Sequence, residues 1–220
     1  MIPQVLSYAL AERCDALMDA CLPAVRREAS PEMSLATTFA LTMAMPLIVI
    51  PLERLSDDGE EDSMRAERPG RFVEEFRRGM QGRFGDAPFR GDGVWYAAEH
   101  EGPPKAPSHW GWALRGPVAS ERNRERADAS QARHVMWGIR HALSHGCVAY
   151  LDDDGNYAPA RVAGMLAFAA CNRAGTRAYI RAIRQDEFIR FLKGWAAWLQ
   201  EIGCGTDTSF WHPKFRRAAD

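Results

Sequence analysis

Several features that would place this chain in a familiar class of protein are missing. Its five cysteines are odd in number and form no paired Cys-x-x-Cys spacing, which favours reduced, buried thiols over a disulfide framework. The formal net charge is only -1, which excludes coating of nucleic acid through bulk positive charge. Any contact with RNA therefore has to be local.

The chain also lacks a long uninterrupted hydrophobic run. The most apolar stretch, Phe39 to Leu52, contains Pro46 and Pro51 and is shorter than the ~20 residues that a membrane helix needs. Charged residues occur from Glu12 onward, so the N-terminus shows no signal-peptide pattern. These absences predict a cytoplasmic protein without a membrane segment, in which the apolar stretch is a kinked, buried helix.

What is present is the material for a helical core. The 220 residues are 46% hydrophobic, and apolar side chains recur with helical spacing in five segments. Charged residues dominate positions 56–70, and Gly, Pro and Trp dominate positions 85–117, so both stretches are expected to be long loops. The tryptophans of the second loop either pack on the helices or stack on unpaired RNA bases. The expected helices cover residues 4–28, 31–55, 71–84, 119–145 and 186–202.

The pattern changes to that of β-structure between the last two helices. Residues 147–151 are expected to form a short strand and residues 152–156 a turn, whose three aspartates lack the oxygen spacing and terminal glutamate of a calcium loop. Residues 165–170 and 177–184 flank a turn and predict a β-hairpin. The expected fold is mainly α, a single domain over residues 1–202 with a small antiparallel β insertion at 147–185 before the last helix. Residues 203–220 are expected to form a C-terminal tail.

The end of the helix over 119–145 carries residues suited to RNA cleavage. Arg140, His141 and His145 lie just before Gly146, a natural helix stop. When the 2′-hydroxyl of RNA attacks the neighbouring phosphate, it needs a base, an acid, and positive charge at the phosphorane. Imidazole accepts and donates protons near neutral pH, and guanidinium binds phosphate through two parallel hydrogen bonds.

The spacing of these residues leaves other interpretations open. Five residues at about 100° each place Arg140 and His145 roughly 140° apart around the helix, whereas His141 and His145 share a face. Both cations would be favourable near a helix C-terminus without any further role. The two histidines also have the separation of a zinc pair, with Cys147 or His134 as a third ligand, although no glutamate follows His141 as a metallopeptidase requires.

The segment IRHALSHG at a helix end resembles the ribonuclease motif of the HEPN superfamily. The resemblance extends to VAYLDDDGN, to the strand pair containing LAF and YIRAI, to the final helix DEFIRFLKGWAAWL, and to the early helix MAMPLIVIPLER. It covers about two-thirds of the chain and leaves residues 56–117 unaccounted for. It implies a HEPN-like helical bundle that forms a homodimer and cleaves RNA without a metal or other cofactor. Such proteins act as endoribonucleases in toxin–antitoxin or phage-defence settings, while others are inactive scaffolds or partners of nucleotidyltransferases.

The resemblance also assigns roles to individual residues. Arg140 and His145 occupy the Arg and His positions of the motif, and His141 stands where asparagine or aspartate is more usual. His145 would be the general base or acid and Arg140 the phosphate clamp, with His141 and Ser144 orienting them. Three arginines would guide RNA toward a cleft shared by two subunits, or would simply form a solvated helix face. They are Arg124, Arg126 and Arg133. The alternative function is a non-catalytic HEPN dimer that acts as a binding or scaffold partner.

Overall fold

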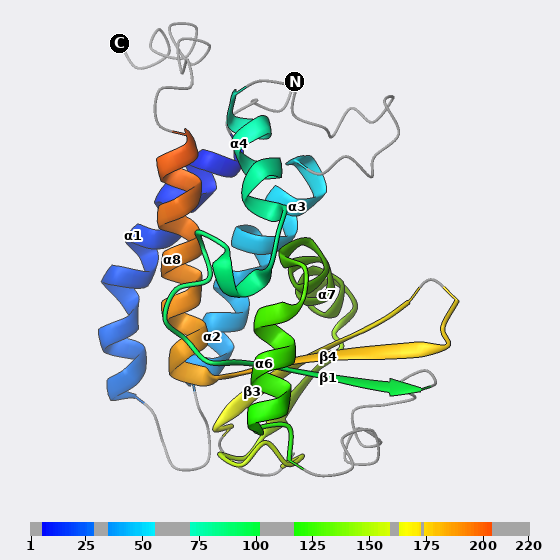
Figure 1. Ribbon diagram of the computed structural model, residues 1–220. Helices are drawn as coiled ribbons and strands as arrows, with labels where there is room; N and C mark the ends of the chain where they lie inside the picture. Colours follow the sequence, from blue (N-terminus) through cyan, green and yellow to red (C-terminus); the bar gives the residue numbers. More distant parts are fainter. Residues whose placement is uncertain are drawn as a thin grey trace, which may run out of the picture.

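The protein is mainly helical, with a small antiparallel sheet extending from one side of the helices (Figure 1). The computed structural model describes residues 6–28, 35–55, 71–101, 117–158, 163–172 and 174–203. Helices α1 (Leu6–Arg27) and α8 (Gln185–Gly203) pack against each other, and the helical stretch at 35–55 packs on both. The expected helices at 4–28 and 186–202 are confirmed. The predicted tail at 203–220 lies outside the described residues beyond Gly203.

The apolar stretch forms three consecutive helical pieces rather than one kinked helix. These are α2 (Leu35–Ala44), a π-helical turn η1 (Met45–Val49) and α3 (Ile50–Leu55). Pro46 has no N–H for the carbonyl four residues earlier, and the helix widens into a π turn there. Pro51 likewise offers no N–H to the carbonyl of Leu47. The buried indole N–H of Trp195 in α8 donates to that oxygen instead, at 2.6 Å.

By length and composition alone, Leu35–Leu55 is a candidate membrane span. However, 44% of its most apolar window is buried inside the structure, and the core helix of a soluble protein passes the same test. Its neighbours include α1, α7 and α8. Leu47 and Ile48, in the middle of the stretch, are fully buried in the core.

The long helix expected over 119–145 is divided in two, so that prediction is wrong. The pieces are α6 (Glu121–Ala129) and α7 (Ala132–His145), separated by Ser130 and Gln131 in extended conformation. Phe84 donates its N–H to the carbonyl of Ser130 at 2.7 Å, and Ala132 donates to Gly82 at 3.0 Å. Backbone groups at the break therefore bond to a distant segment instead of continuing the helix. That segment links α4 (Arg71–Met80) to the 3₁₀ turn η2 (Phe84–Asp86), so the helix expected over 71–84 ends early.

The sheet has one more strand than expected. Its order is β1-β4-β3-β2, all antiparallel, and the hairpin of β3 (Met165–Cys171) and β4 (Arg177–Arg184) is confirmed together with β2 (Val148–Leu151). Strand β1 (Trp95–Glu101) pairs with β4 along its whole length. The expectation of a loop throughout 85–117 is therefore wrong for these seven residues.

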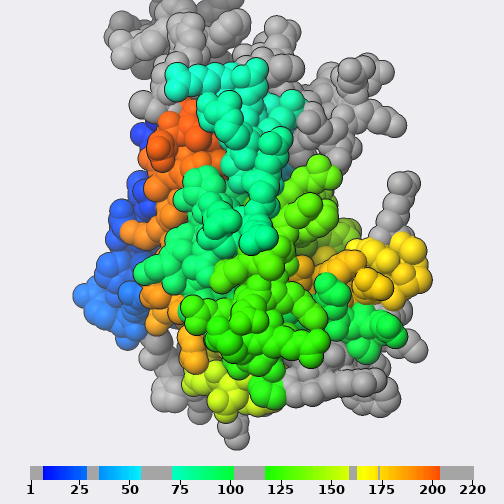
Figure 2. All heavy atoms as spheres, viewed as in Figure 1, coloured from blue at the N-terminus to red at the C-terminus, as the bar shows by residue number. Residues whose placement is uncertain are grey.

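Aromatic side chains fill the core between the sheet and the helices. Trp95, Trp195 and Phe89 are fully buried, and the rings of Phe89 and Trp195 meet edge to face with centroids 4.7 Å apart. Of the two interpretations of the loop aromatics, packing holds for Trp95. In the space-filling view, atoms of residues 71–101 and of α6 lie side by side over this face of the core and sheet (Figure 2).

Candidate functional site

The C-terminal end of α7 places the predicted catalytic residues at a well-defined helix terminus. Gly146 adopts a left-handed conformation (φ 68°), which a residue with a side chain rarely takes. The N–H of Cys147 then reaches back to the carbonyl of Ala142 at 2.8 Å. The chain turns directly into β2, and His145 stands exposed as the last residue of the helix.

His141 and His145 are in contact, as their separation of four residues predicts. Their ring centroids are 4.4 Å apart and the rings are tilted by 45°. Burial lowers the pKa of His141 below its ordinary value, and the nearby charges of His145 and Arg140 lower it further. The lowered pKa favours the neutral form of His141, which is able to accept a proton.

Arg140 is held on the side of α7 that faces α3. Its guanidinium forms an ion pair with Glu53 and lies 5.1 Å from the ring centroid of Trp137. The side chain is 20% exposed, so it is partly covered but not sealed in the interior. Its buried Nε has no hydrogen-bond partner, and burial lowers its pKa from the ordinary value of arginine. Within the described part of the chain, no ion pair, hydrogen bond or ring contact joins Arg140 to His145.

The other predicted site residues lie apart from the helix end or carry no specific contact. Ser144 is exposed beside His145. Arg133 is exposed in the first turn of α7, about 18 Å along the axis from His145 at 1.5 Å per residue. On α6, Arg124 pairs with Glu121 at 3.6 Å, and Arg126 is half-buried. The three arginines therefore belong to the far end of α7 and to α6.

The structure supports neither a zinc site at His141 and His145 nor a calcium loop at residues 152–156. Within the described ranges, no group of three or more His, Cys, Asp or Glu side chains is arranged to hold a metal ion. The thiol of Cys147 points to the carbonyl of His145, 3.8 Å away. In the acidic turn, Asp152 accepts hydrogen bonds from the backbone N–H groups of Asn156 (2.8 Å) and Asp154 (3.0 Å), which lower its pKa. The carboxylate is thus used to close the turn.

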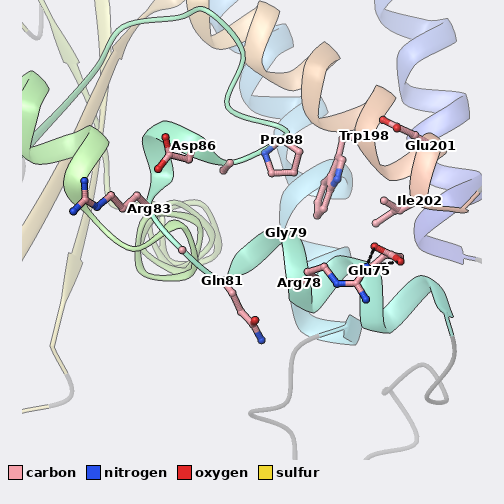
Figure 3. Close-up of a pocket in the computed structure, with 12 residues that line it drawn as sticks. Glu75, Arg78, Gly79, Gln81, Arg83, Asp86, Pro88, Trp198, Glu201 and Ile202 are labelled. Atoms are coloured by element: carbon pink, nitrogen blue, oxygen red, sulfur yellow. Dashed lines mark hydrogen bonds and ion pairs between the residues drawn. The ribbon is translucent and has the colours of Figure 1, made fainter.

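An open groove of about 460 Å³ lies elsewhere, between α4, the segment after it and the end of α8 (Figure 3). The ring of Trp198 forms one wall, and the charged pair Glu75 and Arg78, joined at 2.7 Å, borders it. None of the predicted site residues lines this groove. It is a separate surface feature.

Two contributors to the site were missed in the sequence. Glu53 stands near the end of an otherwise apolar helical stretch, and Trp137 precedes Arg140 by three residues on the same helix. Glu53 and Arg54 are the two charged residues that end this apolar stretch, and charges beside a core indicate partners of opposite sign, because an unpaired charge is costly there. The identity of those partners depended on the fold.

No protein-family model, curated protein or solved structure matches this chain. The resemblance to HEPN proteins therefore rests on the sequence segments alone.

Proposed function

We propose that the protein is a metal-independent endoribonuclease of HEPN type, acting at the C-terminal end of α7. The observation that carries the proposal is the contact between two imidazoles, one of which has a pKa lowered by burial and by the nearby charges of His145 and Arg140. Such a set supplies a base, an acid and a fixed positive charge without a further cofactor. The second support is the spacing of Arg140 and His145, which resembles that of the HEPN ribonuclease motif.

The proposed reaction gives the two histidines different roles. Neutral His141 takes the proton of the 2′-hydroxyl, whose oxygen attacks the adjacent phosphorus. His145, which is exposed at the end of the helix, acts as the general acid and donates a proton to the departing 5′-oxygen as that P–O bond breaks. Arg140 stabilises the extra negative charge of the phosphorane. The products are a 2′,3′-cyclic phosphate and a 5′-hydroxyl.

The proposal includes a homodimer, because one helix does not bring all three groups to one point. Arg140 is directed toward α3, and the spacing predicts an angle of roughly 140° between it and His145. A two-fold partner would add a second copy of both residues to a shared cleft, as the HEPN resemblance implies. A role as a toxin or phage-defence effector, with an antitoxin or nucleotidyltransferase partner, belongs to the same proposal.

One observation favours a second function. The ion pair between Arg140 and Glu53 ties α7 to α3, which is a structural use of the residue assigned to catalysis. In that case the protein is a non-catalytic HEPN dimer and a binding partner. The Trp137 ring beneath the same guanidinium also favours a structural role for Arg140.

Cleavage of a structured RNA in EDTA separates the two functions. The parent is compared with Arg140→Ala, His141→Ala and His145→Ala, and His134→Ala is the matched control because it removes an exposed histidine from the other end of α7. The nuclease predicts cutting by the parent and the control, with a loss of at least about 100-fold in Arg140→Ala, His141→Ala and His145→Ala. Equal cutting by all five proteins, or no cutting of several RNAs by the parent, contradicts it.

A further inference from the structure

The outward face of α7 carries a tryptophan that the proposed reaction does not use. Trp137 is partly exposed in the middle of the helix, and the buried residues of α7 lie on the opposite side. Residues three and four apart are neighbours on a helix surface. The four such positions around Trp137 hold two arginines and two histidines, which are Arg133, His134, Arg140 and His141. The 14 residues of α7 include no aspartate or glutamate.

A guanidinium lies on each side of this ring along the helix. That of Arg140 is 5.1 Å from the centroid of the Trp137 ring and also pairs with Glu53 of α3. Arg133 is one turn nearer the start of α7, about 6 Å along the axis from Trp137 at 1.5 Å per residue. It is exposed and forms no ion pair with any residue of the described segments. Its charge is therefore available to a ligand.

An aromatic ring between two guanidinium groups fits a nucleotide with its two flanking phosphates. Any base stacks on an aromatic face, and a guanidinium binds phosphate oxygens through parallel hydrogen bonds. The base has to be unpaired, because bases inside a duplex are stacked on one another and do not reach the ring. An acidic peptide would use the arginines alone. Unpaired RNA is the partner that uses the ring and both charges.

We propose that Trp137 binds an unpaired base of the RNA by stacking, while Arg133 and Arg140 bind the phosphates on either side of that nucleotide. The inference rests on the proposed function and deepens it. It places the recognised base one turn of α7 before His141, so the phosphate at Arg140 is the one beside the two histidines. Trp137 thus positions the scissile bond and takes no part in proton transfer.

The test measures binding to the full chain at low salt by fluorescence anisotropy. The first probe is a short single-stranded RNA carrying 2′-O-methyl groups, which the proposed nuclease cannot cut. The second is the same strand with abasic nucleotides, and the third is a duplex of the same sequence. The variants are Trp137→Leu, Trp137→Phe and Arg133→Met. The matched controls are Tyr150→Leu, at a 38% exposed aromatic residue of β2, and Arg177→Met, at an exposed arginine of β4.

We expect the parent to bind the single strand at least about tenfold more tightly than the abasic strand, because only the former offers bases for stacking. Trp137→Leu should lose this preference, and Trp137→Phe should retain most of it, since phenylalanine keeps an aromatic face. Arg133→Met should weaken binding of both strands by a similar factor, because it removes a phosphate contact. Both controls should bind like the parent.

Three results overturn the inference. The first is equal binding of the normal strand, the abasic strand and the duplex by the parent, which indicates a surface that reads phosphate alone. The second is an unchanged base preference in a folded Trp137→Leu variant. The third is unchanged binding by Arg133→Met, which decides the matter even where Trp137→Leu does not fold, because Arg133 is exposed.

The probes that resist cleavage separate this inference from the nuclease itself. A base preference that depends on Trp137, without any cleavage of unmodified RNA, supports the binding site and overturns the nuclease. Cleavage that depends on His145, without a base preference, supports the nuclease and overturns the binding site.

Discussion

Replacing Glu53 by glutamine tests what Arg140 does. The substitution keeps the size of the side chain and removes its charge, so it weakens the tie between α3 and α7 without opening a cavity. The two side chains are 20% and 33% exposed, which makes the pair intermediate between surface and buried pairs. Surface pairs contribute about 0.2–1 kcal/mol, and breaking a buried pair costs about 3–5 kcal/mol. We therefore expect Glu53→Gln to lower the free energy of unfolding by about 1–2 kcal/mol.

The assay is urea unfolding of the parent, Glu53→Gln, Arg140→Met and the double variant, which gives the coupling energy of the pair. Glu75→Gln is the matched control, because it breaks the pair with Arg78 on the outside of α4, where the arginine side chain is 69% exposed. That change should cost no more than about 0.5 kcal/mol.

RNA cleavage by the same variants separates catalysis from support. If the guanidinium of Arg140 acts on the phosphate, Glu53→Gln leaves the charge of Arg140 in place and should cleave RNA within about tenfold of the parent rate. Arg140→Met should lose about 100-fold or more of the cleavage rate. Matching losses of stability and of cleavage in the two single variants would refute this reasoning. Arg140 would then serve only to hold α7 against α3.

Three further predictions follow from individual contacts. Trp195→Phe should lower the free energy of unfolding by about 1–3 kcal/mol in urea titrations, because it leaves the carbonyl of Leu47 buried without a donor; an unchanged midpoint would contradict that. Gly79→Ala should destabilise by about 1–3 kcal/mol despite the helix preference for alanine, since the new methyl would lie 2.3 Å from the ring of Trp198; a more stable variant would show that the ring can move. In an NMR titration, His141 should titrate below its ordinary pKa, so its contribution to stability is present above pH 6.5 and is lost as the pH falls from there through the lower folded pKa. A titration at or above pH 6.5 would remove the basis for using it as the general base.

Regular helices were predictable where the pattern is local. The segments at 4–28 and 186–202 have apolar residues on one face, and α1 and α8 form there. The division of the long helix at Ser130 was not predictable, because it depends on backbone bonds to Gly82 and Phe84. The helix propensity of residues 119–145 does not indicate that the backbone there will bond to Gly82 and Phe84.

Strand β1 was missed for the same reason. Its residues stand among Gly, Pro and Trp, which favour a loop, and it becomes a strand by pairing with β4, far along the chain. The contact of His141 with His145 followed directly from their separation on one helix. The pairing of Arg140 with Glu53 did not, since it required the packing of α3 near α7.

The central claim is that RNA is cut by its own 2′-hydroxyl at the end of α7, and the chemistry of the product tests it most directly. A short RNA is incubated with the protein in EDTA, and the same RNA carrying 2′-O-methyl groups is incubated in parallel. The masses of the fragments are measured by mass spectrometry. The account predicts fragments ending in 2′,3′-cyclic phosphate from the unmodified RNA and an intact methylated RNA. Cleavage of the methylated RNA, or fragments formed only after a divalent metal is restored, would contradict it.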